Sequence, residues 1–205
     1  MEAERMKRAT YGLFGGLFAL ALVPVVVLLY LRFGNPPVAV RDKPFPFEAA
    51  LVKIPRHARI ERDEPQVCPL PRTDANLIAG AKIYVSDCAS CHGYKNGNAL
   101  YSRDMYPPAP NLWARHKKTV VGVSDDPVGE TYWKVQNGIR LTGMPAFSTL
   151  LNDTHMWQVS MSLSGANQPL PAAADALVRA PQNTAQTSLE TNQGSSEVAG
   201  RSRLR

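Results

Sequence analysis

The strongest pattern in the chain is an uninterrupted run of uncharged, mostly apolar residues near its beginning. The run extends from Tyr11 to Leu31; a polar stretch, residues 1–10, precedes it and Arg32 closes it. As a helix these residues would extend over roughly 31 Å, which matches the hydrocarbon core of a bilayer at about 30 Å. The pattern therefore predicts a transmembrane anchor over residues 11–31.

A cleaved secretory signal is the alternative interpretation of this run. Signal sequences have shorter apolar regions, of about 7–15 residues, and end in a small-residue cleavage site. This run is longer and ends without such a site, so we expect an uncleaved anchor. Arg5, Lys7 and Arg8 precede the run and outweigh the basic residues directly after it. By the positive-inside rule the N-terminus is cytoplasmic and the remainder lies outside.

Within the run, Gly12 and Gly16 form a pair of small residues on one helix face. Such a pair lets two helix backbones approach closely. It predicts a docking face for another transmembrane helix. The alternative is that glycine is simply common in membrane helices.

After the anchor the pattern changes three times. Residues 32–73 contain eight prolines, which we expect to exclude a regular helix or a central strand and to leave a linker. Residues 74–168 carry helical periodicity and predict the folded domain. Residues 169–205 contain no aromatic residue and many small polar ones, so they predict a disordered tail.

The folded domain is predicted to be all-α, with a long loop from Gly93 to about Pro127. A second helix is expected from Asp126-Pro127 to Gly138, and a third from Asn152 or Asp153 to Gly165. The first helix is expected to be capped by Asp74, and its apolar positions are Leu77, Ile78, Ala81, Tyr84, Val85 and Cys88.

The net charge of +6 leaves nucleic acid, anionic lipid or an acidic protein as possible partners. The charges are scattered, and the densest short run, residues 115–118, is typical of a solvated loop. No helix-turn-helix, RNP-like or zinc-finger signature is present in the sequence. We therefore expect no nucleic-acid partner.

The three cysteines carry the clearest chemical signal. Cys68, Cys88 and Cys91 are an odd number, which excludes a fully paired disulfide framework. The string Cys88-Ala-Ser-Cys91-His92 has the spacing of a haem attachment site. On a helical turn the two thiols can each reach one vinyl group of the same porphyrin, and the histidine is delivered beneath the iron. The motif predicts one haem c bound covalently through Cys88 and Cys91, with His92 as an axial ligand.

Two other interpretations of the motif are weaker. A thioredoxin-like pair needs a βαβ setting, which the pattern does not provide. A structural zinc site needs four ligands. Cys68 with His57 or His116 would complete the four, but no second pair has the required spacing.

The sixth position of the iron is best filled by Met144, which stands in Gly143-Met144-Pro145 between two predicted helices. A His/Met site raises the reduction potential of a haem. Five other side chains fit less well, because they lie too near His92 or are expected in the core or at the surface: Met105, Met156, Met161, His116 and His155.

With these motifs in place, residues 74–168 resemble the class I c-type cytochromes, in particular small single-haem domains linked to bacterial respiratory complexes. The matching strings are Cys88-Ala-Ser-Cys-His-Gly93, Pro107-Pro-Ala-Pro-Asn-Leu112 and Asn137-Gly-Ile-Arg-Leu-Thr-Gly-Met-Pro-Ala-Phe147. The resemblance implies an all-α cytochrome c domain with helices around one haem.

The resemblance also implies roles for single residues. The carbonyl of Pro110 would accept a hydrogen bond from His92, and Arg140 would lie near a haem propionate. For Arg140 the alternative is an exposed cation at a helix end. Tyr132, Trp133 and Trp157 are expected near the haem, although they would be core residues in any fold. Cys68 lies outside the pattern and predicts either an intermolecular disulfide or a buried cysteine.

The function expected from this reading is the transfer of single electrons between or within membrane respiratory or photosynthetic complexes, not enzymatic catalysis. The haem domain would lie on the periplasmic side of a bacterial cytoplasmic membrane, with membrane or periplasmic redox proteins as partners. One alternative is a relay subunit of a periplasmic dehydrogenase or oxidase. A haem enzyme or gas sensor would need an open sixth position, and a structural subunit would not need the complete ligand set.

Overall fold

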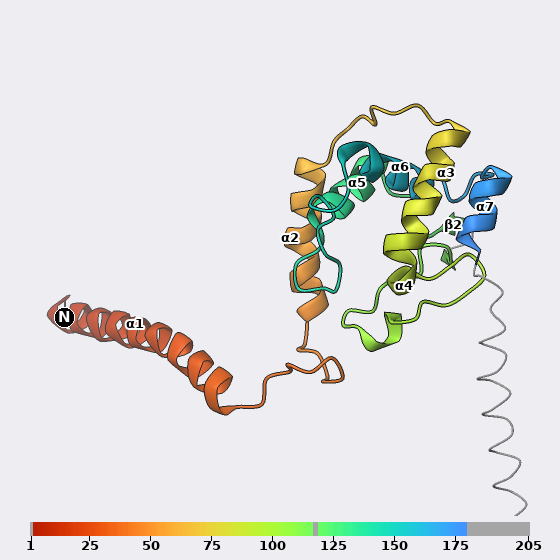
Figure 1. The fold of residues 1–205 in the computed structure, drawn as a ribbon. Helices are drawn as coiled ribbons and strands as arrows, with labels where there is room; N and C mark the ends of the chain where they lie inside the picture. Colours follow the sequence, from red (N-terminus) through yellow and green to blue (C-terminus); the bar gives the residue numbers. More distant parts are fainter. Residues whose placement is uncertain (1, 117–118, 180–205) are drawn as a thin grey trace, which may run out of the picture. The chain divides into compact units, whose positions relative to one another are not determined.

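The structure is a computed structural model that describes residues 2–116 and 119–179 (Figure 1). The chain divides into two compact units at Leu51 and Val52, and each is treated separately. Helices dominate both units, which confirms the predicted all-α class.

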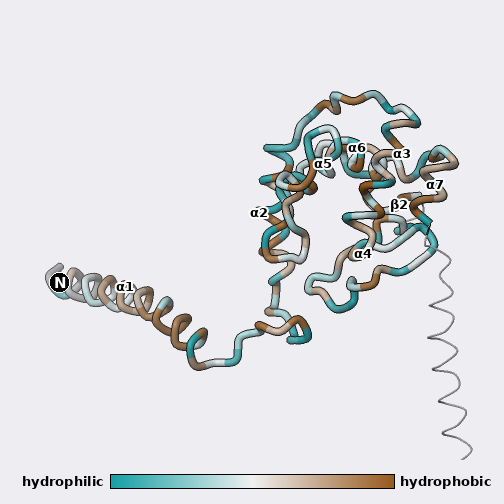
Figure 2. Tube along the Cα trace, in the orientation of Figure 1, coloured by the Kyte–Doolittle hydropathy of each residue, from teal (hydrophilic) through white to brown (hydrophobic). Residues whose placement is uncertain are grey.

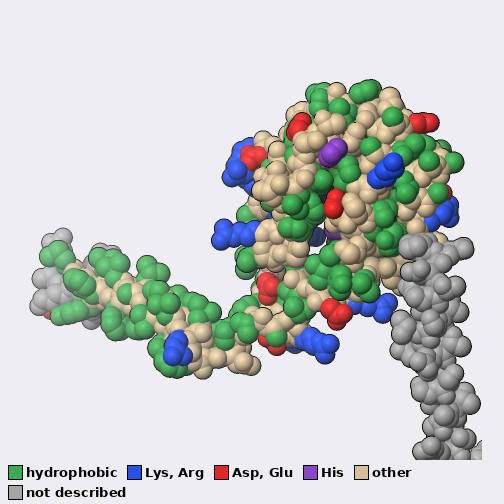
Figure 3. Space-filling view, viewed as in Figure 1, with side chains coloured by type: hydrophobic (Ala, Val, Ile, Leu, Met, Phe, Trp, Pro, Cys, Tyr) green, Lys and Arg blue, Asp and Glu red, His purple; other side chains and the backbone are tan. Residues whose placement is uncertain are grey.

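The first unit is built on the helix α1, Glu2–Phe33. Its segment Thr10–Phe33 has a mean hydropathy of 2.6 and none of it is buried. Figure 2 shows the apolar colouring along this helix, and Figure 3 shows its hydrophobic side chains exposed on all visible sides. By length and composition α1 is able to cross a membrane, a property that a signal sequence near the N-terminus shares.

The predicted absence of regular structure from residues 32–73 is wrong, because the helix α2 covers Glu48–Asp63 and includes Pro55. A proline inside a helix destabilises it by about 3 kcal/mol, and α2 contains one proline. The remaining prolines lie outside the helix, and most of the residues between are good helix formers. Ile60 is buried and fixes one face of α2. The number of prolines was misleading because they gather at the two ends of the segment.

Besides most of α2, the second unit contains three helices of ten or more residues at or near the predicted positions. They are α3 (Asp74–Ile83), α5 (Val128–Asn137) and α6 (Asp153–Ser164). The first begins as expected, except that Thr73, not Asp74, is the N-cap: its hydroxyl accepts a hydrogen bond from the Asn76 amide.

Shorter elements complete this unit. The chain continues from α3 into a π-turn, Tyr84–Cys88, and the one-turn helix α4, Ala89–His92. A 3-10 turn, η2, covers Ser102–Asp104. The strands β1 (Arg115–His116) and β2 (Val120–Val121) pair antiparallel in a small hairpin, with Arg115 opposite Val121.

The core lies where α3 crosses α6 and where α5 packs on α6. At the first crossing Gly80 lets the helices approach so closely that a Cβ there would overlap the backbone carbonyl of Gln158. The Ser162 hydroxyl donates to the carbonyl of Leu77 at 3.1 Å. At the second, the rings of Tyr132 and Trp157 stack with centroids 4.0 Å apart. These two contacts hold the three helices together and leave α3 in position to present the haem motif.

The predicted boundary of the folded domain at residue 168 is also wrong. The helix α7, Ala172–Val178, packs on α3, and Ala174 and Val178 are fully buried. The Lys95 amide donates to the carbonyl of Val178 at 2.9 Å, and Lys95 forms an ion pair with Asp175. Small aliphatic residues supply the buried surface, so the lack of aromatic residues was a poor guide. The rest of the predicted tail, residues 180–205, lies outside the described residues.

The ion pair makes the attachment of α7 sensitive to pH. Hydrogen bonds from Lys95 and Arg179 hold the pKa of the Asp175 carboxyl below its usual value. A carboxyl group whose pKa is lowered on folding stabilises the folded state at any pH above its ordinary pKa. This stabilisation is lost as the pH falls through the lowered pKa. The anchoring of α7 should therefore weaken in acid.

Two truncations separate the packed part of the tail from the rest. Deleting residues 181–205 should leave thermal unfolding and haem content unchanged, because α7 ends at Val178 and is kept whole. Deleting residues 169–205 should lower the unfolding free energy by at least about 2 kcal/mol, since it exposes the surface under Val178 and Ala174. Equal melting curves for the two truncated proteins would show that α7 does not pack as described.

Candidate haem site

The haem motif is presented by a helix whose last turns are unwound. In the π-turn the Ala89 amide donates to the carbonyl of Tyr84, five residues back. The hydroxyl of the buried Tyr84 donates to the carbonyl of Gly93 at 2.6 Å and so fastens the end of the motif to the start of the π-turn before it. Such π-turns are common at functional sites. The result is a short platform from Cys88 to His92.

Cys88 and Cys91 are both free thiols and half-buried. Burial raises the pKa of the Cys88 thiol to about 12, and Asp87 adds to the effect. In the chain as described this thiol is protonated at neutral pH. Addition of the S–H group of such a thiol across a vinyl group gives a thioether.

His92 is held by one hydrogen bond that fixes its chemical state. Its Nδ1 lies 2.8 Å from the carbonyl oxygen of Pro110. A carbonyl can only accept, so Nδ1 carries the proton and Nε2 has its lone pair free. Burial lowers the pKa of His92, while the Pro110 carbonyl acts in the opposite direction. The imidazole is thus neutral and oriented, as a metal ligand must be.

Asn111 holds the Pro110 carbonyl in place. Its Oδ1 accepts from the amides of Trp113 at 2.9 Å and Ala114 at 3.1 Å, and its Nδ2 donates to the carbonyl of Gly97 at 3.2 Å. The amide of Leu112 also donates to the carbonyl of His92 at 3.2 Å. Sequence reasoning missed this role of Asn111. The signal was its place directly after Pro110 in an otherwise irregular loop.

Gly93 makes room for this arrangement. Its φ is +77°, in the region that favours glycine, and a Cβ there would lie 2.9 Å from Nδ2 of Asn111. A side chain at this position would push the Asn111 loop away from the motif. The glycine after His92 is therefore required by space and by backbone conformation.

Met144 is carried by a tight turn that follows α5. The Ile139 amide donates to the carbonyl of Met144 at 3.2 Å, and the Met144 amide donates to Oγ1 of Thr142 at 3.1 Å. Gly138, with a φ of +67°, lets the chain after Met144 pass close to the end of the helix. The Met144 side chain is half-buried and packs against the core.

The other predicted site residues are placed as follows. Arg140 is exposed on the same turn as Met144. Tyr132 and Trp157 are buried in the core stack, and Trp133 is half-buried. Burial and a hydrogen bond to Asp153 raise the pKa of Tyr132 to about 12, so it stays a neutral phenol.

The side chains weighed as alternative iron ligands are accounted for in part by other contacts. His116 bonds through Nε2 to the carbonyl of Gly122 in the hairpin. His155 is exposed near the start of α6, and Met156 and Met161 are buried in that helix. Met105 is half-buried and lies beside the Met144 turn.

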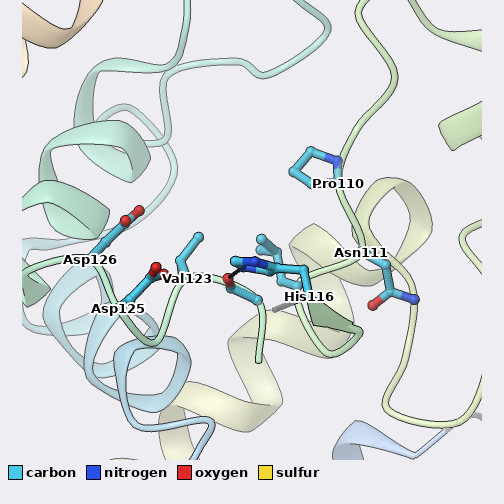
Figure 4. Close-up of a pocket in the computed structure, with 8 residues that line it drawn as sticks. Pro110, Asn111, His116, Val123, Asp125 and Asp126 are labelled. Atoms are coloured by element: carbon cyan, nitrogen blue, oxygen red, sulfur yellow. Dashed lines mark hydrogen bonds between the residues drawn. The ribbon is translucent and has the colours of Figure 1, made fainter. Parts of the chain in front are cut away.

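A cavity of about 280 Å³ lies beside the Pro110 loop, but it is not the haem site. Figure 4 shows His116, Asp125, Asp126 and Val123 around it, with Pro110 and Asn111 also at its wall. None of the motif cysteines, His92 or Met144 lines it. Nor do three metal-binding side chains converge here or elsewhere within residues 2–116 and 119–179, so the zinc alternative gains no support.

The donor set fits a covalently bound haem. Two free cysteines and one neutral imidazole lie on a single short platform, and the imidazole already has its second nitrogen engaged by Pro110. A metal ion alone would need these three groups to converge on one point, which they do not do. A porphyrin, which takes the thiols at its edge and the imidazole at its centre, matches the arrangement.

Residues 75–160 match the family described as cytochrome c oxidase, cbb3-type, subunit III. No curated protein matches the chain. Among solved structures, a chain of the Kuenenia stuttgartiensis reducing HAO-like protein complex Kustc0457/Kustc0458 is similar, with 22% identity and a TM-score of 0.37. That match covers 48% of this chain and 46% of the other, so the chain spans less than half the length of that protein.

The family match and the helical fold support a c-type cytochrome. Residues 75–160 match a cytochrome c domain, and domains of this kind bind haem covalently and transfer electrons.

Proposed function

We propose that this protein is a membrane-anchored mono-haem cytochrome of class I that carries single electrons outside the cytoplasmic membrane. Cys88 and Cys91 bind the one haem covalently, and His92 and Met144 are the two axial ligands. Pro110 orients His92. Arg140 lies toward a propionate.

The observation that carries the proposal is the hydrogen bond from Nδ1 of His92 to the carbonyl of Pro110. It joins two of the strings that carry the resemblance, the haem motif and the Pro-Asn-Leu loop, at a single atom pair. It also leaves Nε2 of the same ring free on the platform that carries both thiols. When bound, the haem supplies a one-electron Fe(III)/Fe(II) couple.

The protein side of the site is suited to electron transfer and not to substrate chemistry. A thioether from Met144 and an imidazole from His92 would fill both axial positions, which leaves no position for a substrate or gas. Hydrogen bonds close the backbone beside both residues, at Gly93 next to His92 and at Met144 itself, so we expect the site to change little between oxidation states. This argues against the enzyme or sensor alternative.

A spectroscopic redox titration of the purified protein tests this function. It should give a single reversible one-electron transition, and the reduced protein should bind carbon monoxide slowly or not at all. Two transitions would require a second haem, and rapid binding of carbon monoxide would favour the enzyme or sensor class.

The partner is proposed to be a membrane redox complex. The matched family is described as an oxidase subunit, and α1 offers a membrane span. We infer that the protein is either a tethered shuttle or a fixed relay subunit, with Gly12 and Gly16 available for contact with another helix in the second case. Stable co-purification with a larger complex from mildly solubilised membranes would select the relay subunit.

The anchor and its orientation are tested together. N-terminal sequencing of the membrane-extracted protein should find a chain that still contains Tyr11–Leu31. Protease added to spheroplasts should digest the haem domain, because that domain faces the periplasm. A mature chain that begins beyond Leu31 would show that the segment is a cleaved signal.

A further inference from the structure

The loop between the haem motif and Pro110 has no explanation in the electron-transfer scheme so far. Its residues 100–110, called the strap here, are tied to the motif at their start. The amides of Leu100 and Tyr101 both donate to the carbonyl of Ser90, at 3.1 and 3.3 Å. Ser90 stands between the two haem-binding cysteines.

The strap is also tied at its end. Pro110 is the acceptor for His92, and the hydroxyl of Ser102 donates to the carbonyl of Ala109 at 2.7 Å. The strap is therefore closed on itself and is bonded to the proximal side of the haem site at two places. Its middle begins directly after the turn η2 and lies between these two attachment points.

Met105 occupies this middle and contacts the distal side. A Cβ built on Gly143 would overlap the terminal methyl of Met105, and its sulfur would lie 3.8 Å away. The thioether of Met105 thus rests on Gly143, the residue directly before Met144. Gly143 has no unusual φ, so a side chain at this position would be opposed only by Met105, whose end would have to move aside.

The Met144 turn has few stabilising contacts of its own, so packing by another segment would stabilise it. The hydrogen bonds of Ile139, Thr142 and Met144 run within the turn itself. Leu141, at its tip, has a φ of +62° and is 81% exposed. A branched-chain residue in that backbone region is strained, and little packing of its own side chain offsets the strain.

We propose that Met105 is a positioning residue that holds the Met144 turn over the haem iron. The inference rests on the proposed function, in which Met144 is the sixth ligand. Packing of Met105 on Gly143 limits the outward movement of the turn and so slows dissociation of the Met144 sulfur from iron. The strap then joins the two thioether sites, the proximal imidazole and the distal ligand in one continuous segment.

The test compares Met105→Ala with Met105→Leu in the full-length holoprotein. The readouts are the rate of carbon monoxide binding to the reduced protein and the thioether-to-iron charge-transfer absorption of the oxidised protein. Met105→Ala should bind carbon monoxide about tenfold faster than the unmodified protein, because a packed side chain is lost. Met105→Leu keeps the volume and should stay within about twofold.

A size exchange tests the contact itself. Gly143→Ala should act like Met105→Ala, because its methyl group displaces Met105. The double variant Met105→Ala with Gly143→Ala should be closer to the unmodified protein than either single variant, since the new methyl group enters the vacated space. This double variant keeps the proposal testable if one single variant folds poorly, and thermal unfolding of each variant shows whether it does.

Three results would overturn the proposal. Carbon monoxide binding in Met105→Ala at the unmodified rate would show that Met105 is only surface packing. Additive effects in the double variant would show that Met105 and Gly143 do not act through contact. Loss of the charge-transfer absorption in Met105→Leu, with its retention in Met144→Leu, would make Met105 the ligand. Failure of the proposed function would differ from all three, because the unmodified protein would then bind carbon monoxide rapidly.

Discussion

Met144→Ala should convert a six-coordinate haem into one that binds carbon monoxide rapidly in the reduced state. The substitution removes the sulfur that we propose fills the sixth position, and it should leave the proposed thioether bonds through Cys88 and Cys91 intact. The reduction potential should fall, because a thioether ligand favours reduced iron. Stopped-flow mixing with carbon monoxide and a potentiometric titration measure the two effects.

A pair of matched variants separates loss of a ligand from loss of packing. Met144→Leu and Met156→Leu both conserve volume, and substitutions of this kind usually cost less than about 1.5 kcal/mol. Met156 is buried in α6 and is not a predicted ligand. Met144→Leu should bind carbon monoxide rapidly in the reduced state, like the alanine variant, whereas Met156→Leu should bind it slowly or not at all. If both variants bind carbon monoxide as slowly as the unmodified protein, Met144 is not the sixth ligand.

The second large effect is expected at Gly80, where α3 crosses α6. Gly80→Leu should lower the unfolding free energy by about 3 kcal/mol, because its side chain would meet the backbone of Gln158 and the hydroxyl of Ser162. Overpacking against backbone is severe, since backbone cannot rotate away. Thermal or denaturant unfolding of the holoprotein measures the loss.

The control for Gly80→Leu is Ala75→Leu on the same helix. Ala75 is exposed, so leucine there should change the unfolding free energy by no more than about 0.5 kcal/mol. Equal stability of the two variants would contradict the described crossing. It would also remove the main support for the position of the haem motif, which continues directly from α3.

The elements that the sequence predicted correctly are those in which local signals and burial agree. The helices α5 and α6 begin and end near their predicted residues, because Pro127 and Asn152 precede them and Gly138 and Gly165 follow. The apolar run Tyr11–Leu31 lies within α1 for the same reason. Apolar periodicity and capping residues act over a few positions, so one sequence is enough to detect them.

The elements that sequence reasoning missed depend on contacts between distant residues. The helix α7 is short, and its stability comes from the buried Val178 and from the ion pair between Lys95 and Asp175. In α2, the burial of Ile60 and a run of helix formers outweigh the single Pro55. Composition alone predicts neither helix, because it does not show which apolar side chains are buried against other elements.

The candidate site divides in the same way. The haem motif was predicted from its spacing and Met144 from its place between two helices, and the pairing of His92 with Pro110 was expected from resemblance to known cytochromes. The contact of Met105 with Gly143 and the role of Asn111 arise from the folding of the irregular loop after His92. That loop has no periodicity, so its contacts follow only from the three-dimensional structure.

The most direct test of the account is the intact mass of the denatured chain after expression with the machinery that attaches haem c. The mass should exceed that of the polypeptide by one haem, and the extra mass should persist under conditions that remove non-covalent haem. The variant Cys88→Ser with Cys91→Ser should have the mass of the polypeptide alone. A wild-type chain with no covalent haem, or with two, would contradict the central claim that this protein carries electrons on one haem held by Cys88 and Cys91.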